Sequence, residues 1–257
     1  YILTLKKCIS IIFEIIHWGQ NLTKIGKWLI ILNMLDVIIN HMKDKTISFC
    51  ITCCDLDYNL LDGLIKLLRN QTEPPDEVVI SSSGITADKL HTGSIIIAGK
   101  EIPIINTNSE VRHSEGAARN AAAKVSSHEL VQFFDVDDIP HNQRIEFTKK
   151  IFNTTKCDAL VHGYKTGNHS NFAQHVYDSS LLFECYWKPD NGLGGGQLRA
   201  NDECNIAHGP ITVKKDVFDV VAYGKDPRAA DCKFCGNLIS NNKKVFYYHE
   251  ELMYYTL

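Results

Sequence analysis

The segment 130–138 places the strongest constraint on how this chain can fold. Leu130–Phe134 is an apolar run, with Gln132 as its one polar residue, that leads directly into Asp135-Val136-Asp137-Asp138. An apolar run without polar alternation is typical of a strand buried on both faces of a parallel sheet. In open α/β sheets, ligands bind outside the carboxyl ends of such strands. The segment therefore predicts an α/β protein with an acidic ligand site at the end of a buried strand.

The residues before this segment alternate between strand and helix patterns. A buried first strand is expected over Thr46–Cys54, and shorter strands are expected over Glu77–Ile80 and Ile102–Ile105. Apolar residues recur at helical spacing in Tyr58–Asn70. A second helix is predicted over Ser114–Val125, with the hydroxyl of Ser114 as its N-cap. This alternation favours a mainly parallel sheet flanked by helices.

The residues after the acidic segment have a weaker pattern. Lys165–Asn205 is polar, aromatic and rich in glycine, which predicts a mobile binding loop that closes over a ligand. Regular structure is expected to return over Pro210–Val220, in a helix over Cys232–Ile239, and in the aromatic segment Val245–Tyr255.

Composition limits the class of protein. A chain of 257 residues with 44% hydrophobic content can bury one large core, so a single catalytic domain is expected. The net charge of -3 provides no basic field for a nucleic-acid backbone, and nucleic acid is therefore not an expected partner. Nine scattered cysteines do not resemble a disulfide framework, so the thiols are expected to be reduced. This favours a location in the cytoplasm or on the cytoplasmic face of a membrane.

Residues 1–44 differ in character from the rest and are treated as an apolar leader. Their two apolar runs, Ile9–Trp18 and Trp28–Ile39, are each too short to span a bilayer. Two interpretations stay open. Residues 1–41 are either a membrane-proximal pair of helices, through which the chain would associate with a membrane, or a non-native leader preceding Met42.

The acidic cluster itself indicates a metal. Two carboxylates one residue apart at a strand end repel each other unless a cation or hydrogen-bond donors offset their charge. Ligation by oxygen atoms suits Mn²⁺ or Mg²⁺, which leave coordination positions open for substrate phosphates. The alternative is a solvated acidic turn, because a D-x-D pattern is common by chance.

Several segments resemble the inverting family 2 glycosyltransferases of the GT-A fold. The nucleotide-sugar half of that family, expected here over residues 45–150, is matched in order by Ser48–Asp55, Gln71–Pro75, Glu77–Ile80, Gly116–Asn120 and Phe133–Asp138. The acceptor half, expected over 151–257, is matched by Gly209–Phe218 and Ala230–Phe234. The resemblance implies a GT-A domain over 45–257 with a mixed, mainly parallel sheet. It also implies transfer of a sugar from a nucleotide-diphospho-sugar, in particular a UDP-sugar, to a glycan, protein or lipid acceptor.

The resemblance also assigns roles to residues. The metal would be bound by Asp137 with Asp135, and His249 is a further candidate ligand. The residues expected at the donor are Thr52, Cys53, Asp55, Ser82, Arg119, Asn120, Asp135 and Val136. Where the family usually has an aspartate after the second strand, this chain has Ser82 and Ser83.

Asp231 is the expected catalytic base. An inverting transfer is a single displacement, so the acceptor hydroxyl must lose its proton to a group on the face opposite the diphosphate. Asp135 and Asp137 lie on the diphosphate side. Asp231 stands before the predicted helix Cys232–Ile239, whose dipole would keep a carboxylate ionised. The competing interpretation of Asp231 is a helix N-cap.

Two other functions are considered. A sugar nucleotidyltransferase would share the sheet and the metal carboxylates, but the turn after the first strand, Cys53–Tyr58, contains no glycine that would let backbone amides approach a triphosphate. A zinc-stabilised carbohydrate-binding module without catalytic activity is suggested by Cys204, His208, Cys232 and Cys235.

Overall fold

The computed structural model describes residues 44–167, 172–192, 194–201, 206, 209–226 and 228–256. Residues 45–257 form one compact unit. The leader and its apolar runs, and also Cys204 and His208, lie outside the described residues. Within the described part, no helix is both long and apolar enough to cross a bilayer.

Twelve strands and four α-helices are described. The strands are β1 (Ile47–Cys54), β2 (Glu77–Ser83), β3 (Ser94–Ile97), β4 (Lys100–Ser109), β5 (Leu130–Asp135), β6 (Ile139–Pro140), β7 (Ala159–Thr166), β8 (Leu182–Glu184), β9 (Tyr186–Pro189), β10 (Gly196–Arg199), β11 (Thr212–Lys214) and β12 (Val245–Tyr255). The helices are α3 (Leu61–Leu68), α4 (Glu115–Val125), α5 (Arg144–Thr154) and α6 (Ala230–Ser240). Short 3-10 turns are η1 (Tyr58–Leu60), η2 (Ala87–Lys89), η3 (Ser179–Leu181) and η4 (Lys215–Asp219).

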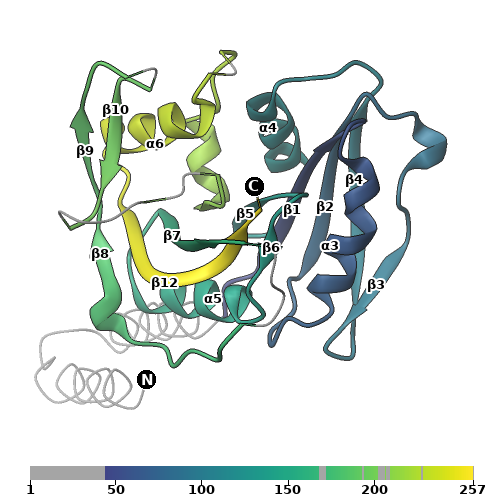
Figure 1. Cartoon of the computed structure of the whole chain (residues 1–257), viewed down its shortest axis with the longest axis horizontal. Helices are drawn as coiled ribbons and strands as arrows, with labels where there is room; N and C mark the ends of the chain where they lie inside the picture. Colours follow the sequence, from purple (N-terminus) through teal and green to yellow (C-terminus); the bar gives the residue numbers. More distant parts are fainter. Residues whose placement is uncertain are drawn as a thin grey trace, which may run out of the picture. The chain divides into compact units, whose positions relative to one another are not determined.

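The main sheet has the strand order β3-β4-β2-β1-β5-β11-β7-β12-β6, with β8 added on β12 (Figure 1). The neighbours β4, β2, β1 and β5 are parallel, so their carboxyl ends share one edge. β11 runs antiparallel between β5 and β7. The chain therefore enters β11 at the same edge at which β5 ends.

Helices cover both faces of this sheet (Figure 1). Side chains of α3 and α5 pack against one face, together with Phe49 and Phe134, and those of α4 and α6 pack against the other, together with Phe133. Residues 47–53 of β1 are all buried, as expected for a strand covered on both faces. The sheet with helices on both sides confirms the predicted fold class.

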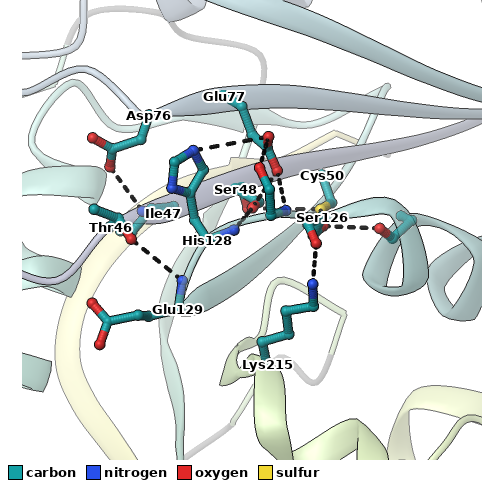
Figure 2. A network of polar contacts seen from close by, with 12 residues as sticks. Thr46, Ile47, Ser48, Cys50, Asp76, Glu77, Ser126, His128, Glu129 and Lys215 are labelled. Carbon is teal, nitrogen blue, oxygen red and sulfur yellow. Dashed lines mark hydrogen bonds and ion pairs between the residues drawn. The ribbon is translucent and has the colours of Figure 1, made fainter.

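A polar network joins the amino ends of three of these strands (Figure 2). The Glu77 carboxylate at the start of β2 accepts hydrogen bonds from the Ser48 hydroxyl at 2.6 Å and from the backbone N–H of Ser127 at 2.7 Å. The Ser127 hydroxyl also donates to Glu77, and His128 Nε2 lies 3.8 Å from its carboxylate. Burial acts to raise the pKa of Glu77, but the bonds from Ser127 and Ser48 lower it below its usual value. The network therefore holds a buried, ionised carboxylate.

The predicted elements agree well with the structure before residue 136 and less well after it. The strand expected over Glu77–Ile80 continues to Ser83. Ser114 caps α4 as predicted, because its Oγ accepts a hydrogen bond from the N–H of Ala117 at 3.4 Å. No strand was predicted within 165–205, but in the described part β8 pairs with β12, and β9 and β10 form an antiparallel hairpin. Closure of this segment over a ligand stays a prediction. The predicted dividing line after residue 150 falls inside α5.

The β9–β10 hairpin packs tightly on α6 because both elements have a glycine next to the Trp187 ring. A Cβ on Gly196 would lie 2.5 Å from Trp187 Nε1, and one on Gly236 would lie 3.0 Å from the same ring. The thiol of Cys232 donates to the Gly196 carbonyl at 3.3 Å. Such close contacts are available only where a residue has no side chain.

Candidate functional site

Asp135 is the last residue of β5 and lies at the shared carboxyl edge of the parallel strands. Its β1 neighbour Thr52 donates a hydrogen bond from Oγ1 to Asp135 Oδ1 at 3.1 Å. From α4, Arg119 Nη2 donates to both Asp135 oxygens, at 2.9 and 3.1 Å. The structure therefore brings three predicted donor residues together and fixes the Asp135 carboxylate from two elements.

Arg119 is 0% exposed although its guanidinium is charged. It forms a second ion pair, one helical turn back, with Glu115, and its guanidinium carbon lies 5.5 Å from the centre of the Tyr223 ring. Burial acts to lower the pKa of Arg119, but nearby negative charge, mainly that of Asp135, raises it above its usual value. Its Nε and Nη1 have no hydrogen-bond partner among the described residues. A buried guanidinium of this kind stays charged only because acidic groups surround it.

Asp231 reaches the same place from α6. The helix begins at Ala230, so Asp231 lies in the first turn and is not the N-cap, which is Ala229. Asp231 Oδ1 accepts a hydrogen bond from the N–H of Cys232 at 2.9 Å. A Cβ built on Gly209 would lie 3.2 Å from Asp135 Oδ2, 3.4 Å from Arg119 Nη2 and 4.0 Å from Asp231 Oδ2. These three side chains, from β5, α4 and α6, therefore face one another across Gly209.

The acidic loop after β5 is held by the end of β12. The backbone N–H of Thr256 donates to Asp138 Oδ1 at 3.2 Å, and the Thr256 hydroxyl donates to the Asp137 carbonyl. Asp138 is buried, and burial raises its pKa to about 7. Asp137 is exposed at the turn. Its pKa is also raised, first by partial burial and then by the charge of Asp135.

Beneath this loop lies a buried cation that sequence analysis missed. Arg144, the first residue of α5, donates from Nη2 to the carbonyls of Phe133 and Pro210, each at 3.1 Å. It thereby joins the end of β5 to the turn that follows Gly209. Its guanidinium carbon lies 4.5 Å from the centre of the Phe134 ring. No sequence pattern around Arg144 distinguishes it from a surface helix residue, so its burial could not be predicted from the sequence.

Glu115 is a second group that was not predicted for the site. It lies in the first turn of α4 and pairs with the buried Arg119. The i,i+4 spacing of Glu115 and Arg119 is the signal that could have found it. Burial raises the pKa of Glu115, as do the charges of Asp135 and Asp231. The site therefore contains more carboxylates than cations.

The residues present fit a divalent cation at Asp137. Among the described side chains, no Lys, Arg or His forms an ion pair with Asp137, whereas Asp135 already has Arg119. Carboxylate oxygens beside an anionic substrate are the ligands that Mg²⁺ and Mn²⁺ accept. No group of three or more His, Cys, Asp or Glu residues in the described ranges is arranged to hold a metal. His249, exposed on β12, is thus not gathered with the two aspartates, because the strand carries it away from their turn.

Three of the predicted donor residues have their side chains engaged elsewhere. Cys53 is buried in the core on the α3 side, and burial raises its pKa to about 12. Val136 is buried in the same core. The Asn120 side-chain amide forms two hydrogen bonds with the backbone of Tyr223. Its Nδ2 donates to the Tyr223 carbonyl at 2.9 Å, and its Oδ1 accepts from the Tyr223 N–H at 3.0 Å. Asn120 therefore fixes the Tyr223 loop on α4, and Cys53 and Val136 offer only backbone atoms.

Asp55 and Ser82 lie at the ends of β1 and β2, beyond Thr52. Asp55 accepts a hydrogen bond from Arg112 Nε at 2.9 Å, and both side chains are partly exposed. A Cβ on Gly84 would lie 2.9 Å from Asp55 Oδ1, so this turn depends on a glycine. The hydroxyl of Ser82 is buried and has no partner among the described residues. These groups extend the site along the sheet edge, away from Asp231.

The cysteines offered as zinc ligands are not arranged as a site in the described residues. Cys235 is fully buried in the core between α6 and the sheet, while the Cys232 thiol contacts Gly196. A separate cavity of about 990 Å³ lies at the opposite, amino edge of the sheet, where its lining includes Lys45, Lys124 and Lys215. Of the predicted site residues, only Asn120 lines that cavity.

The sheet, the acidic strand end and the carboxylate on α6 define a GT-A-type glycosyltransferase. A family model described as Glycosyl transferase family 2 matches residues 48–221, and the chain therefore belongs to that family. This confirms the membership predicted from the segments between Ser48 and Phe234.

Solved structures show the same fold. The crystal structure of Staphylococcus aureus TarS 1–349 aligns with a TM-score of 0.55 at 16% identity, covering 81% of this chain and 60% of that one. The complex of TarS 1–349 with UDP-GlcNAc gives a TM-score of 0.56 at 15% identity, with 82% and 58% covered. A further crystal structure of TarS gives a TM-score of 0.57 at 15% identity, with 82% of this chain and 37% of that one covered. The chain thus spans less than two thirds of each of these proteins. No curated protein sequence matches it.

Proposed function

We propose that this chain is an inverting glycosyltransferase that transfers a sugar from a nucleotide-diphospho-sugar, in particular a UDP-sugar, to an acceptor hydroxyl. One observation carries the proposal: Asp135, Arg119 and Asp231 face one another across Gly209, while Asp137 lies beyond Asp135 with no cation partner among the described side chains. Membership of glycosyl transferase family 2 supports it, as does a fold shared with TarS, which has been solved with UDP and with UDP-GlcNAc.

Asp137 and Asp135 would hold Mn²⁺ or Mg²⁺ against the donor diphosphate. Two carboxylates repel a diphosphate unless a cation lies between them. The bound cation offsets the negative charge that develops on the departing nucleotide. Arg119 and Thr52 hold Asp135 in one orientation, so its remaining lone pairs stay directed at the sheet edge.

Asp231 would accept the proton of the acceptor hydroxyl. Its Oδ1 is held by the N–H of Cys232, which leaves Oδ2 on the side of Gly209. The N-terminus of α6 and the Arg119 guanidinium lie on the same side as this carboxylate. In a single displacement the base and the diphosphate lie on opposite sides of the anomeric carbon, so Asp231, which comes from α6, would act on the side away from the metal.

The acceptor class and location follow as parts of the same proposal. The acceptor is a hydroxyl group of a glycan, protein or lipid, and the protein acts in the cytoplasm or on the cytoplasmic face of a membrane. Unbonded thiols support a reducing compartment. The cysteines described as free are Cys50, Cys53, Cys54, Cys157, Cys185, Cys232 and Cys235.

A donor screen tests the proposal. UDP-GlcNAc, UDP-glucose, GDP-mannose and their nucleoside diphosphates are each added with Mn²⁺, Mg²⁺ or EDTA, and the melting temperature and the release of free nucleotide are measured. We expect stabilisation and slow hydrolysis by at least one UDP-sugar in the presence of metal. If no nucleotide sugar binds with either metal, the proposal fails. Release of pyrophosphate from UTP and a sugar 1-phosphate would instead identify a nucleotidyltransferase.

A further inference from the structure

Resting on the proposed function, we infer that Asn120 is a positioning residue for the base Asp231. Asn120 fastens Tyr223 to α4, and the Tyr223 ring in turn holds the first turn of α6, which carries Asp231. Asn120 thus acts on proton transfer through Tyr223 and not through contact with the donor.

The two hydrogen bonds between Asn120 and the backbone of Tyr223 join segments 103 residues apart. One side chain satisfies both the N–H and the carbonyl of a single residue, which fixes that residue in position and in orientation. Gly116 lies one turn earlier on α4, where a Cβ would lie 3.0 Å from Tyr223 Cβ and 3.3 Å from the Gly224 carbonyl oxygen. The Tyr223 loop therefore lies directly against α4.

The Tyr223 ring connects this loop to α6. It is buried and stacks on the Phe234 ring, with the ring centres 4.0 Å apart and the planes 7° apart. The Phe133 ring of β5 meets it edge-on at 5.7 Å, and the Arg119 guanidinium carbon lies 5.5 Å from its centre. Phe234 follows Asp231 by one turn of α6, so the stack holds the turn that carries Asp231.

The start of α6 depends on these packing contacts. Its N-cap, Ala229, forms no side-chain hydrogen bond to the helix, and a helix end without a capping side chain frays more easily. The buried Tyr223 hydroxyl has no partner among the described residues. Tyr223 is therefore held by its ring contacts and by Asn120, and loss of the Asn120 bonds would let the ring and the helix start shift together.

Such a shift should lower turnover and spare donor binding. Asp135 is fixed by Arg119 and Thr52, and the predicted metal ligand Asp137 follows β5, so the donor side does not depend on α6. A base displaced by about 1 Å can lower the rate by about 100-fold, because proton transfer requires hydrogen-bonding distance.

Asn120→Ala tests this inference. The reaction is the hydrolysis of UDP-GlcNAc, or of whichever nucleotide sugar stabilises the wild type most, with Mn²⁺. Water takes the place of the acceptor and must also lose a proton. We expect kcat to fall by about 10-fold or more, while KM and the affinity for the nucleoside diphosphate stay within about 2-fold of the wild type. A loss confined to KM, or an unchanged kcat, would overturn the inference.

The double variant with Asp231→Asn separates positioning from general loosening. Once the base is absent it cannot be misplaced, so Asn120→Ala should cause no further loss of kcat in the Asp231→Asn background. Losses that multiply would overturn the inference alone. If Asp231→Asn by itself leaves kcat unchanged, the proposed base has failed, and if the wild type binds no nucleotide sugar, the proposed function has failed.

Gly116→Ala disturbs the same loop from another position and keeps the test open if Asn120→Ala does not fold. Alanine favours a helix over glycine, but its methyl group would lie 3.0 Å from Tyr223 Cβ and must push the loop away from α4. Gly116→Ala should therefore also lower kcat, and should have no effect in the Asp231→Asn background. A Gly116→Ala variant with the kcat of the wild type would contradict the role of this loop.

Two control variants complete the experiment. Gly63→Ala adds a methyl group to a helical glycine with nothing within 4 Å of its Cβ. Asp158→Ala removes a side chain that bonds the Lys214 ammonium and the Lys244 N–H, each at 2.9 Å, at the amino edge of the sheet. Both should keep the kcat of the wild type, although Asp158→Ala should lower the melting temperature. A fall in kcat for Asp158→Ala equal to that for Asn120→Ala would show general loosening and overturn the inference.

Discussion

Arg119 Nη2 contacts both carboxylate oxygens of Asp135, at 2.9 and 3.1 Å, from a position that no solvent reaches. A buried guanidinium cannot be replaced by an ammonium group without losing this geometry. We expect Arg119→Lys to lower the free energy of unfolding by about 2 kcal/mol and transfer activity by about 10-fold or more. Urea unfolding and initial rates measure the two effects. Arg228→Lys, at the exposed pair with Asp226, should change neither, and a fully active, equally stable Arg119→Lys would contradict the role of the pair.

Asp137→Asn should separate metal binding from folding. The Asp137 side chain is exposed and forms no ion pair among the described residues, so we expect the free energy of unfolding to change by less than about 0.5 kcal/mol. Donor turnover should fall by about 100-fold or more, because an anionic ligand is lost. Asp219→Asn, an exposed acid at the opposite edge, is the control. Full wild-type activity in EDTA would refute the metal proposal.

Asp231→Asn should abolish proton transfer while donor binding is retained. Asparagine can still accept the hydrogen bond from the Cys232 N–H, so the melting temperature should stay near that of the wild type. Removal of a general base lowers turnover by about 100-fold or more. Asp226 is a poor substitute, because hydrogen bonds from Arg228 and Lys233 hold its pKa well below its usual value. Asp226→Asn should therefore transfer normally; near-normal transfer by Asp231→Asn would show that another group is the base.

Glu77→Gln should reveal a pH-dependent contribution to stability from the network in Figure 2. The folded-state pKa of Glu77 is lowered, so its stabilisation is present above the unfolded-state pKa and is lost as the pH falls through the folded-state value. We expect a loss of about 1 kcal/mol at pH 7 that shrinks below about pH 4. Urea unfolding at several pH values measures it. Glu129→Gln, which removes an exposed partner of Lys45, should show almost no loss, and a pH-independent loss for Glu77→Gln would contradict the sign.

The strand end that carries Asp135 could be predicted because its surroundings are encoded locally. Four apolar residues around Gln132, followed directly by acids, allow little besides a buried strand at a ligand-binding edge. The Ser114 cap is equally local, since one hydroxyl satisfies one N–H three residues away. Such features depend on neighbours in sequence and can therefore be predicted without knowledge of the tertiary contacts.

The groups that were missed depend on distant contacts. Arg144 is an ordinary-looking polar residue at a helix start, and its burial follows from the carbonyls of Phe133 and Pro210 above it. The strands of the β9–β10 hairpin were not predicted, because their packing relies on glycines against Trp187, which leave no hydrophobic periodicity. Position 209 carries no side chain at all, so its importance becomes visible only when three charged groups are found around it.

The antiparallel position of β11 has a consequence for the order of folding. β1 and β2 are neighbours in sequence and pair directly, whereas Gly209 reaches Asp135 only after β11 has inserted between β5 and β7. Pairings between segments distant in sequence form slowly, because the chain between them must first be closed into a loop. During refolding, recovery of nucleotide-sugar binding should therefore coincide with amide protection in β11, at Val213 for example, and lag behind protection of the β1–β2 pair. The site would therefore be completed late, after the first two strands of the sheet have already paired.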